Sequence, residues 1–394
     1  MTASVETDDF ENLAAARDLW ARGSLDDALD AFAAAVRFRP LNVKALVEAA
    51  RAHGSRFEID VAERCLDRAW KLSVSDPRVS ATVAASYGRI HREQRAIELL
   101  QGVDRRSPSA RAALAALLER VNRLEPALAE IEACLSTAPE APELWLAKGR
   151  ILRRRGDAGP AHAALGRALS LARAPAVLAE AWTEICYLHD RAGEHDAAVE
   201  AIEKAHAIIR ATPAAPKLLR QAHANNRAIT ALSHAFQKTR PTSWRVAAPD
   251  PRVGGVAHLI GFPRSGTTLL EQRLDAHPDL IASPERVAFL RDALPALCRA
   301  GGGALTMASL DAAPENVLTC ERRRYLDSME AALGAPLGGR THLDKNPNHT
   351  GLLPGLLRLF PESRFVVSLR DPRDVVTSCV LRTFRVTEFS VMLL

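Results

Sequence analysis

A glycine-rich loop in the second half of the chain has the composition of an anion-binding site. The segment GVAHLIG (residues 255–261) is rich in strand formers, and it leads into FPRSGTTLLEQRLDAHP, whose apolar spacing predicts a loop followed by a helix. A strand, a glycine-rich loop and a helix in this order direct backbone N–H groups and the positive end of the helix dipole toward one spot. The expected anion-binding residues are Arg264, Ser265, Gly266, Thr267 and Thr268.

The spacing of this loop differs from that of an ATP-binding loop. The residues from Gly261 onward read G-x-x-x-x-G-T-T, whereas an ATP-binding loop reads G-x-x-x-x-G-K-[ST]. Thr267 stands in place of the lysine, and the cation Arg264 lies inside the loop instead. This departure argues against a magnesium-dependent kinase or NTPase, which stays an alternative, as does a simple strand–helix turn.

A second phosphate-binding element is expected in RFVVSLRDPRDVVTS, residues 364–378. FVVSL has the composition of a buried strand, Arg370 ends it, and Pro372 opens a helix at its first position. Ser378 follows Arg370 by eight residues, about two turns into that helix. An arginine offers a forked, charge-assisted grip on phosphate and a serine adds a neutral hydrogen bond. A surface arginine beside the helix-capping Asp371 is the alternative interpretation.

These motifs resemble those of sulfotransferases. PRSGTT is similar to their 5′-phosphosulfate-binding loop, which reads P-[KR]-S-G-T-T. In that family an arginine and a serine at this spacing hold the 3′-phosphate of 3′-phosphoadenosine 5′-phosphosulfate (PAPS). The resemblance implies PAPS as the sulfuryl donor and no metal. The donor-binding residues that it implies are Arg264, Ser265, Gly266, Thr267, Thr268, Arg370 and Ser378.

The catalytic base is suggested by a resemblance to the bacterial and tyrosylprotein branch of sulfotransferases. That branch has a D-A-H-P segment after the loop helix, and its base lies 21 positions after the loop arginine, which is Glu285 here. The family often has Gly-Glu-Glu-Thr-Arg around the base, whereas this chain reads Ser-Pro-Glu-Arg-Val, which leaves the acceptor open. An ordinary first-turn helix carboxylate after Pro284 is the alternative.

A single lysine completes the expected catalytic group. Lys345, in Asp-Lys-Asn-Pro, matches the lysine of the family's Asn-Lys-Asp-Pro, which contacts the oxygen bridging phosphate and sulfate. It is the only lysine in residues 241–394, although arginine is frequent there. The resemblance therefore implies Glu285, Lys345 and Arg264 as catalytic residues; a chance lysine among arginines is the alternative for Lys345.

Three histidines in the same half receive no catalytic role. His277 is interpreted as part of a helix stop before a proline, and His342 and His349 stay unassigned. No Ser-His-Asp pattern accompanies them, and neither a CxxC motif nor a His/Cys cluster suggests zinc.

The first half of the chain repeats itself. Alanines recur with spacings of 34, 34, 31, 34 and 37 residues. Four residues after each lies a larger apolar residue and seven after lies a small or apolar one, such as Phe32 and Ala35 after the first. Such a period predicts stacked helix pairs. The recurring residues are Ala28, Ala62, Ala96, Ala127, Ala161 and Ala198.

This period resembles that of the tetratricopeptide repeat, a helix–turn–helix unit. Residues 142–175 and 179–212 match best, with Trp145 and Gly156 on the family's pattern. Small residues allow close helix packing, the glycine makes the turn, and a proline ends the second helix. The resemblance implies about six repeats over residues 9–212 and a concave groove for a protein or peptide partner. Another α-solenoid or a plain bundle is the alternative.

Composition excludes several functional classes. The net charge of +5 is mild and forms no basic stripe, so we expect no nucleic-acid partner. No apolar run approaches the 18 residues that a membrane span requires. Six scattered cysteines do not form a disulfide framework, and reduced cysteines favour a cytoplasmic location.

The sequence thus predicts an α solenoid of tetratricopeptide repeats followed by a partial, P-loop-like, three-layer α/β sulfotransferase domain. We expect the repeats at residues 9–212, a helical connector with a proline-rich linker at 213–252, and the sulfotransferase domain at 253–394, incomplete at its C-terminus by family comparison. The implied function is PAPS-dependent sulfuryl transfer to an acceptor hydroxyl, with protein tyrosine as one candidate and the repeats recruiting partner or substrate. A non-catalytic scaffold with a degenerate or truncated nucleotide-binding domain is the alternative.

Overall fold

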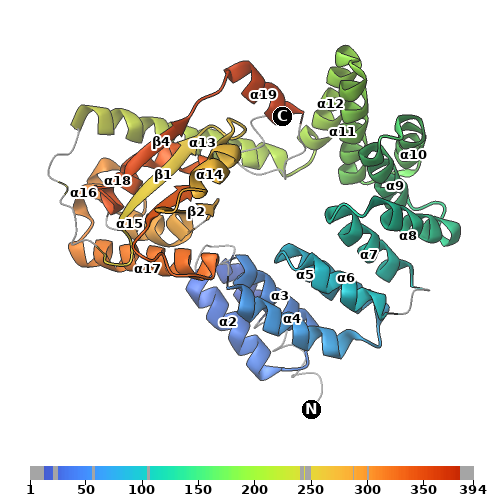
Figure 1. Ribbon diagram of the computed structural model, residues 1–394, viewed down its shortest axis with the longest axis horizontal. Coiled ribbons are helices and arrows are strands. Elements are labelled where there is room, and N and C mark those ends of the chain that lie inside the picture. The colour runs from blue at the N-terminus through green and yellow to red at the C-terminus, as the bar shows by residue number, and fades with distance from the viewer. Residues whose placement is uncertain are drawn as a thin grey trace. The chain divides into compact units, whose positions relative to one another are not determined.

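Figure 1 shows the computed structural model of the chain, in two compact units that divide between Thr212 and Pro213. The first unit is built from helices, and the second combines helices with a parallel sheet, so the predicted fold class is confirmed. No helix in the described part of the chain is long and apolar enough to cross a membrane. The structure describes residues 13–20, 25–55, 58–103, 107–239, 244, 250–286, 288–299 and 301–381.

Helices of the first unit follow one another as antiparallel pairs, each packed on the next. Residues 13–20 are also helical and precede α2. The other pairs are α3 with α4, α5 with α6, α7 with α8, α9 with α10, and α11 with α12. The helices are α2 (Leu25–Phe38), α3 (Val43–Ser55), α4 (Ile59–Ser73), α5 (Pro77–Arg89), α6 (Glu93–Gln101), α7 (Pro108–Arg120), α8 (Leu124–Thr137), α9 (Pro142–Arg155), α10 (Ala158–Leu171), α11 (Pro175–Ala192) and α12 (His195–Arg210).

The recurring alanines explain how the pairs pack. Each lies in the second helix of its pair, and each is at most 3% exposed. The larger apolar residue four positions later, such as Phe32, Leu66 or Leu165, is also buried. A methyl side chain lets the paired helices approach closely, and the larger residue fills the space beside it.

Glycines and prolines mark the ends of these helices. Gly156 and Gly193 have φ values of 98° and 78° and end α9 and α11 in the left-handed conformation, as the sequence predicted for the turns. Pro77 and Pro175 differ from the expectation, because each is the first residue of the following helix rather than the stop of the preceding one. The first helical position needs no N–H donor, so it accepts proline at little cost.

Arginines of α9 connect neighbouring helix pairs. Arg150 contacts the buried Glu119 of the preceding pair at 2.9 Å and Glu180 of the following pair at 3.2 Å. Arg153 pairs with the buried Glu184, and its guanidinium lies 5.0 Å from the centre of the Tyr187 ring. These ion pairs balance the charge of the carboxylates, which burial would otherwise penalise.

In its described residues, the second unit combines four parallel strands with helices. Its elements are α13 (Ala215–Thr239), β1 (Gly255–Gly261), α14 (Thr267–Asp275), β2 (Leu280–Pro284), η1 (Phe289–Ala293), α15 (Leu294–Arg299), α16 (Met307–Ala312), α17 (Glu315–Leu333), β3 (Thr341–Lys345), η2 (Pro347–Leu352), α18 (Leu353–Leu359), β4 (Arg364–Ser368) and α19 (Pro372–Val380). The strand predicted at 255–261 and the helix predicted after the loop both form.

The sheet has the order β2-β3-β1-β4, with β1 between β3 and β4. On one face α14 packs on an apolar cluster that includes Leu259 and Leu343. On the other face Phe289, Tyr325 and Phe360 form the larger core with α17 and α18. Helices on both faces of a parallel sheet give the expected three layers.

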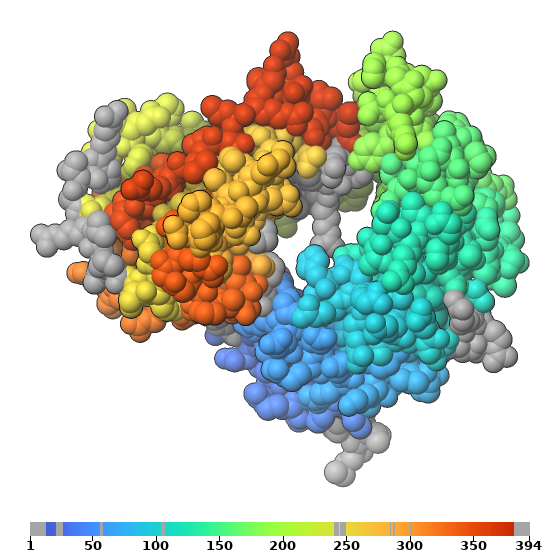
Figure 2. Space-filling view, viewed as in Figure 1, coloured from blue at the N-terminus to red at the C-terminus, as the bar shows by residue number. Residues whose placement is uncertain are grey.

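Strand β4 forms one edge of this sheet and is only partly covered. Its Val367 is 52% exposed and the following Leu369 is 87% exposed. The segment holding β4 and α19 lies at the surface in the view of Figure 2, where it is coloured red. An edge strand of this kind presents unpaired backbone groups beside exposed apolar side chains.

Helix α13 packs within the second unit. Its Leu232 belongs to the larger core, and Ile229 lies so close to Gly351 that an added Cβ there would be 2.8 Å from a methyl carbon. Trp244 follows the helix, packs near Phe236 at a ring distance of 6.1 Å, and donates a hydrogen bond from Nε1 to Asp311 at 2.8 Å. The domain bounds proposed from the sequence stay predictions.

The helix pair α9–α10 offers a direct test of this packing. A Cβ on Gly149 would be 2.6 Å from the Leu165 side chain, whereas a Cβ on Gly166 would meet nothing within 4 Å. Because overpacking a close helix contact is costly, we expect Gly149→Val to lower the free energy of unfolding by about 1–3 kcal/mol. Gly166→Val, the matched control, should change it by less than about 0.5 kcal/mol. Urea denaturation followed by circular dichroism measures both; equal effects would contradict this packing.

Candidate functional site

Site residues predicted from the sequence lie at or just after the carboxyl ends of the four parallel strands. The anion loop follows β1, Glu285 follows β2, Lys345 ends β3, and Arg370 follows β4 by two residues. Because parallel strands share one carboxyl edge, their loops lie together, and open α/β sheets bind ligands at that edge. Strand pairing therefore assembles the site from residues up to 114 positions apart in the chain.

The loop after β1 has the backbone of an anion cradle. Arg264 has φ 71° and Gly266 has φ 95°, and α14 begins directly afterward with no side chain capping its N–H groups. The side chain of Ser265 is buried, and its Oγ has no hydrogen-bond partner among the described residues. An added Cβ at Gly266 would meet nothing within 4 Å. Open space, uncapped N–H groups and an unpartnered hydroxyl suit a phosphate or sulfate group.

The second predicted element joins the loop through Arg264. The Nε of Arg264 donates a hydrogen bond to the Oγ of Ser378 at 3.0 Å. The Nη1 of Arg370 donates to the backbone oxygen of Arg264 at 3.2 Å, and its Nη2 lies 3.4 Å from Asp374. Asp371 caps α19, as expected, by accepting from the N–H of Arg373 at 2.9 Å. Ser378 therefore contacts the loop arginine, and both predicted 3′-phosphate ligands lie at the loop.

Lys345 lies at the centre of the group and its side chain is 3% exposed. Its Nζ donates to Glu285 Oε1 at 2.8 Å and lies 3.4 Å from the hydroxyl oxygen of Thr268. It also lies 3.5 Å from Glu271 Oε2. The structure thus connects Lys345 with both the proposed base and the anion loop.

Glu285 is held by an unusual backbone conformation at the end of β2. Its N–H donates to the carbonyl oxygen of Lys345 at 2.7 Å, and its φ is 22°. Arg264 and Glu285 are the two non-glycine residues of the second unit with positive φ among the described residues. Residues other than glycine adopt such angles at an energetic cost, and they concentrate at functional sites.

Sequence reasoning missed Glu271 of α14. Its side chain is 9% exposed, and burial raises the pKa of its carboxyl group even though Lys345 acts in the opposite direction. Glu271 follows Thr267 by four residues, so the two lie on one helix face, which the helical period could have indicated.

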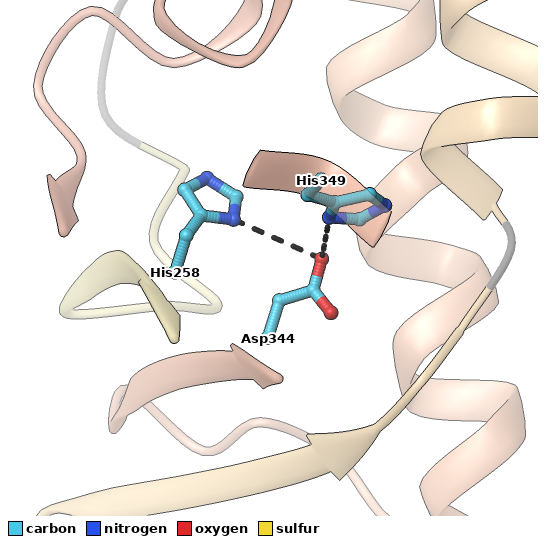
Figure 3. Close-up of side chains that lie close together, drawn as sticks. All are labelled: His258, Asp344 and His349. Carbon is cyan, nitrogen blue, oxygen red and sulfur yellow. Dashed lines mark ion pairs between the residues drawn. The ribbon is translucent and has the colours of Figure 1, made fainter. Parts of the chain in front are cut away.

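A polar cluster lies on the opposite face of the sheet, in the larger core. His258 of β1 and Asp344 of β3 are register partners, and Figure 3 shows them with His349. The Nδ1 atoms of His258 and His349 lie 3.8 Å and 3.4 Å from Asp344 Oδ2, which also accepts a hydrogen bond from Tyr325 at 2.8 Å. All are almost fully buried.

This cluster resembles a metal site only in part. His258, Asp344 and His349 each offer one ligand atom, all within 4.8 Å of one another. A histidine that binds a metal almost always donates its other N–H to a partner, yet both Nε2 atoms have no partner among the described residues. The cluster therefore lacks the outer shell of a metal centre.

Burial and close neighbours shift the pKa values of the ionisable groups in and beside this cluster. Burial alone would raise the pKa of Asp344, but the neighbouring His349 and His258 rings outweigh it and hold this pKa well below its usual range. Burial lowers the pKa of His342 to about 4, so that ring is neutral at pH 7, and it lies 2.9 Å from the Ser283 hydroxyl. His342 and His349 are thus core residues and not part of the site.

Comparison with known proteins agrees with the sequence motifs. Residues 258–392 match a family model described as "Sulfotransferase family". The chain is 33% identical over 129 residues to nodulation protein NoeE of Sinorhizobium fredii, covering 31% of this chain and 30% of that protein. It is 30% identical over 136 residues to protein-tyrosine sulfotransferase 2 of Gallus gallus, covering 33% and 35%. The chain thus spans about a third of the length of these curated relatives. The predicted resemblance to sulfotransferases is confirmed for this region.

Solved structures match about half of the chain at low similarity. The pilus biogenesis factor PilW has a TM-score of 0.41 and 15% identity, covering 52% of this chain and 95% of that one. A tetratricopeptide repeat protein from Parabacteroides merdae has a TM-score of 0.40 and 15% identity, covering 50% and 77%. At these scores the fold assignment rests on the helix pairs themselves.

The depressed pKa of Asp344 gives a pH-dependent prediction. A carboxyl group whose pKa is lower in the folded than in the unfolded chain stabilises the fold above its unfolded pKa, about 3.9, and loses that contribution as pH falls. We expect Asp344→Asn to lower the free energy of unfolding by roughly 1.5–3 kcal/mol at pH 7. The gap to the wild type should shrink below about pH 4.

Urea denaturation at pH 7 and at pH 3.5 measures this gap. Glu315→Gln, an exposed carboxylate in the first turn of α17, is the control and should cost about 0.5 kcal/mol. A gap for Asp344→Asn that stays constant between the two pH values would contradict the assigned charge state.

Proposed function

We propose that the second unit transfers a sulfuryl group from PAPS to an acceptor hydroxyl. One observation carries this proposal: Glu285 and Lys345, from the ends of different strands, meet at 2.8 Å beside Thr268 of the anion loop. A proton acceptor, a cation and an anion cradle in one place are the groups that sulfuryl transfer needs, by analogy with phosphoryl transfer. The family match of residues 258–392 supports the same reaction class.

Donor binding is assigned to the loop and to the segment from Arg370 to Ser378. The N–H groups at the start of α14 and the hydroxyls of Ser265 and Thr268 would hold the 5′-phosphosulfate. Arg370 and Ser378 would hold the 3′-phosphate, and both contact Arg264, which is itself a residue of the loop. Uncapped helix N–H groups and arginines bind phosphate through charge-assisted hydrogen bonds, so no metal is required for this grip.

The transfer itself exchanges one bond for another. Glu285 would accept the proton of the acceptor hydroxyl while that oxygen attacks sulfur. The new oxygen–sulfur bond forms as the bond between sulfur and the bridging oxygen of the donor breaks. Lys345 would neutralise the charge that gathers on the departing phosphate oxygen, together with the loop N–H groups. The products are a sulfate ester and adenosine 3′,5′-bisphosphate, and the proton stays on Glu285 until solvent removes it.

The acceptor is proposed as a hydroxyl of a protein, with tyrosine the first candidate. Support comes from the similarity to protein-tyrosine sulfotransferase 2 of Gallus gallus and from the helix pairs of the first unit, which we propose recruit the acceptor or another protein partner. A screen with labelled PAPS against tyrosine peptides, glycans and small phenols tests both parts. Transfer to glycans but not to peptides would contradict the proposed acceptor.

We expect the protein to bind adenosine 3′,5′-bisphosphate more tightly than ATP, because ATP lacks the 3′-phosphate assigned to Arg370 and Ser378. Calorimetry with each nucleotide measures this preference. Arg370→Gln should weaken bisphosphate binding about tenfold or more, since a charge-assisted phosphate contact contributes roughly 1.5–3 kcal/mol. Arg373→Gln is the matched control, because Arg373 follows Arg370 by three residues, is exposed and pairs with Asp371. Equal or tighter binding of ATP would overturn the sulfotransferase proposal.

We expect Glu285→Gln to lower turnover by about 10²–10⁴, the usual contribution of a general base. The isosteric amide keeps the size of the side chain and removes its capacity to accept the proton. Labelled sulfate transfer to the best acceptor of the screen measures the rate. Near-normal turnover in the variant would mean that Glu285 is only a carboxylate at a strand end.

A further inference from the structure

The ammonium group of Lys345 has more negative partners than its single charge needs. Glu285 and Glu271 approach it at 2.8 Å and 3.5 Å, and the Thr268 oxygen lies at 3.4 Å. Two carboxylates around one buried ammonium carry one negative charge more than Lys345 balances. An anionic donor must therefore compete with at least one of these carboxylates for Lys345.

The two carboxylates differ in how easily each could move away from Lys345, because their exposure to solvent differs. The side chain of Glu271 is 9% exposed and lies on the face of α14 that covers the sheet. The side chain of Glu285 is 55% exposed, so its carboxylate can turn into water without a loss of solvation. Its backbone stays anchored to β3 through the N–H bond to the Lys345 carbonyl at 2.7 Å. Glu285 is thus the exchangeable partner and Glu271 the resident one.

We infer that Lys345 holds Glu285 in an ion pair that the 5′-phosphate group of the donor displaces, so that the base becomes available only when the donor is bound. This inference rests on the proposed function. A phosphate seated at Thr268 would lie beside the Lys345 ammonium and offer it a stronger partner than an exposed carboxylate. No covalent bond changes in this step; one anion replaces another at Lys345, and Glu271 remains in place.

The consequence is an ordered reaction. With the donor absent, one oxygen of Glu285 is occupied by Lys345 and the acceptor hydroxyl has no free base at that position. With the donor bound, Glu285 is released on a backbone that keeps it at the carboxyl edge of the sheet. Donor binding thus precedes proton transfer, and the enzyme couples the two sites through a single lysine.

Calorimetry with two ligands tests this ion-pair exchange. Adenosine 3′,5′-bisphosphate carries the 5′-phosphate that would displace Glu285, and adenosine 3′-monophosphate lacks it. Glu285→Gln leaves Lys345 without its exchangeable partner, so we expect it to bind the bisphosphate about threefold to tenfold more tightly than the wild type. Its affinity for the monophosphate should stay within about twofold of the wild type.

Two further variants distinguish displacement of Glu285 from Lys345 from a simple repulsion between the Glu285 charge and the anionic ligand. In a Lys345→Gln background the gain from Glu285→Gln should fall below about twofold, because there is no ammonium left to release. Glu271→Gln removes an equal charge at a similar distance but should tighten bisphosphate binding less than Glu285→Gln does. Circular dichroism of each variant confirms that the fold is retained.

Each outcome is informative. Equal gains from Glu271→Gln and Glu285→Gln, or a gain from Glu285→Gln that persists without Lys345, would overturn the exchange and leave only repulsion. Failure of the wild type to prefer the bisphosphate over the monophosphate would instead contradict the proposed donor site. The two failures are therefore distinguishable in the same set of titrations.

Discussion

Parallel pairing of β1 with both β3 and β4 is the constraint on which the second unit depends. It aligns Leu259 with Lys345 and Gly261 with Ser368, so that the chain leaves three strands at one edge. Gly261 makes the pairing with β4 possible at this edge, because an added Cβ would lie 2.5 Å from the Ser368 carbonyl oxygen. The anion loop begins at the next residue, so its position follows directly from the sheet.

Two adjacent residues of strand β3 place their side chains on opposite faces of the sheet, in different surroundings. Lys345 points to the α14 side and contacts the loop, whereas Asp344 points to the core and contacts Tyr325 and His349. A slip of one residue would exchange these side chains and bury an ammonium without its carboxylates. The Asp344 cluster has its partners only in the observed register. A purely apolar strand would have no such register-dependent partners.

Local patterns predicted those parts of the site that depend on neighbouring residues. The strand at 255–261, the loop before Thr267 and the helix that Pro372 opens are each visible in a few consecutive residue types. The buried alanines of the first unit were predictable for the same reason, since their period repeats and small residues favour close helices. The prolines were misread because a proline that starts one helix also follows the end of another.

Contacts across the sheet were not predictable, because they depend on register between distant segments. His258 and Asp344 are 86 residues apart, and their pairing requires knowing that β1 lies beside β3 in one alignment. Glu271 can be recognised as a partner of Lys345 only when the side chain of Lys345 is known to point toward α14. Likewise Ser378 was assigned to a phosphate from family spacing, while its contact with Arg264 depends on where α19 folds back.

Lysine suits this centre better than the arginine that is used elsewhere in residues 241–394. Its Nζ lies within 3.5 Å of oxygens from three side chains, Glu285, Thr268 and Glu271, that approach from different directions. A planar guanidinium forms its hydrogen bonds within one plane, whereas a compact ammonium can turn its three protons toward partners that lie in different directions. Exchange of one partner for another at a fixed lysine therefore needs only a rotation of the ammonium group. The same exchange at an arginine would require the whole fork to move within a buried space.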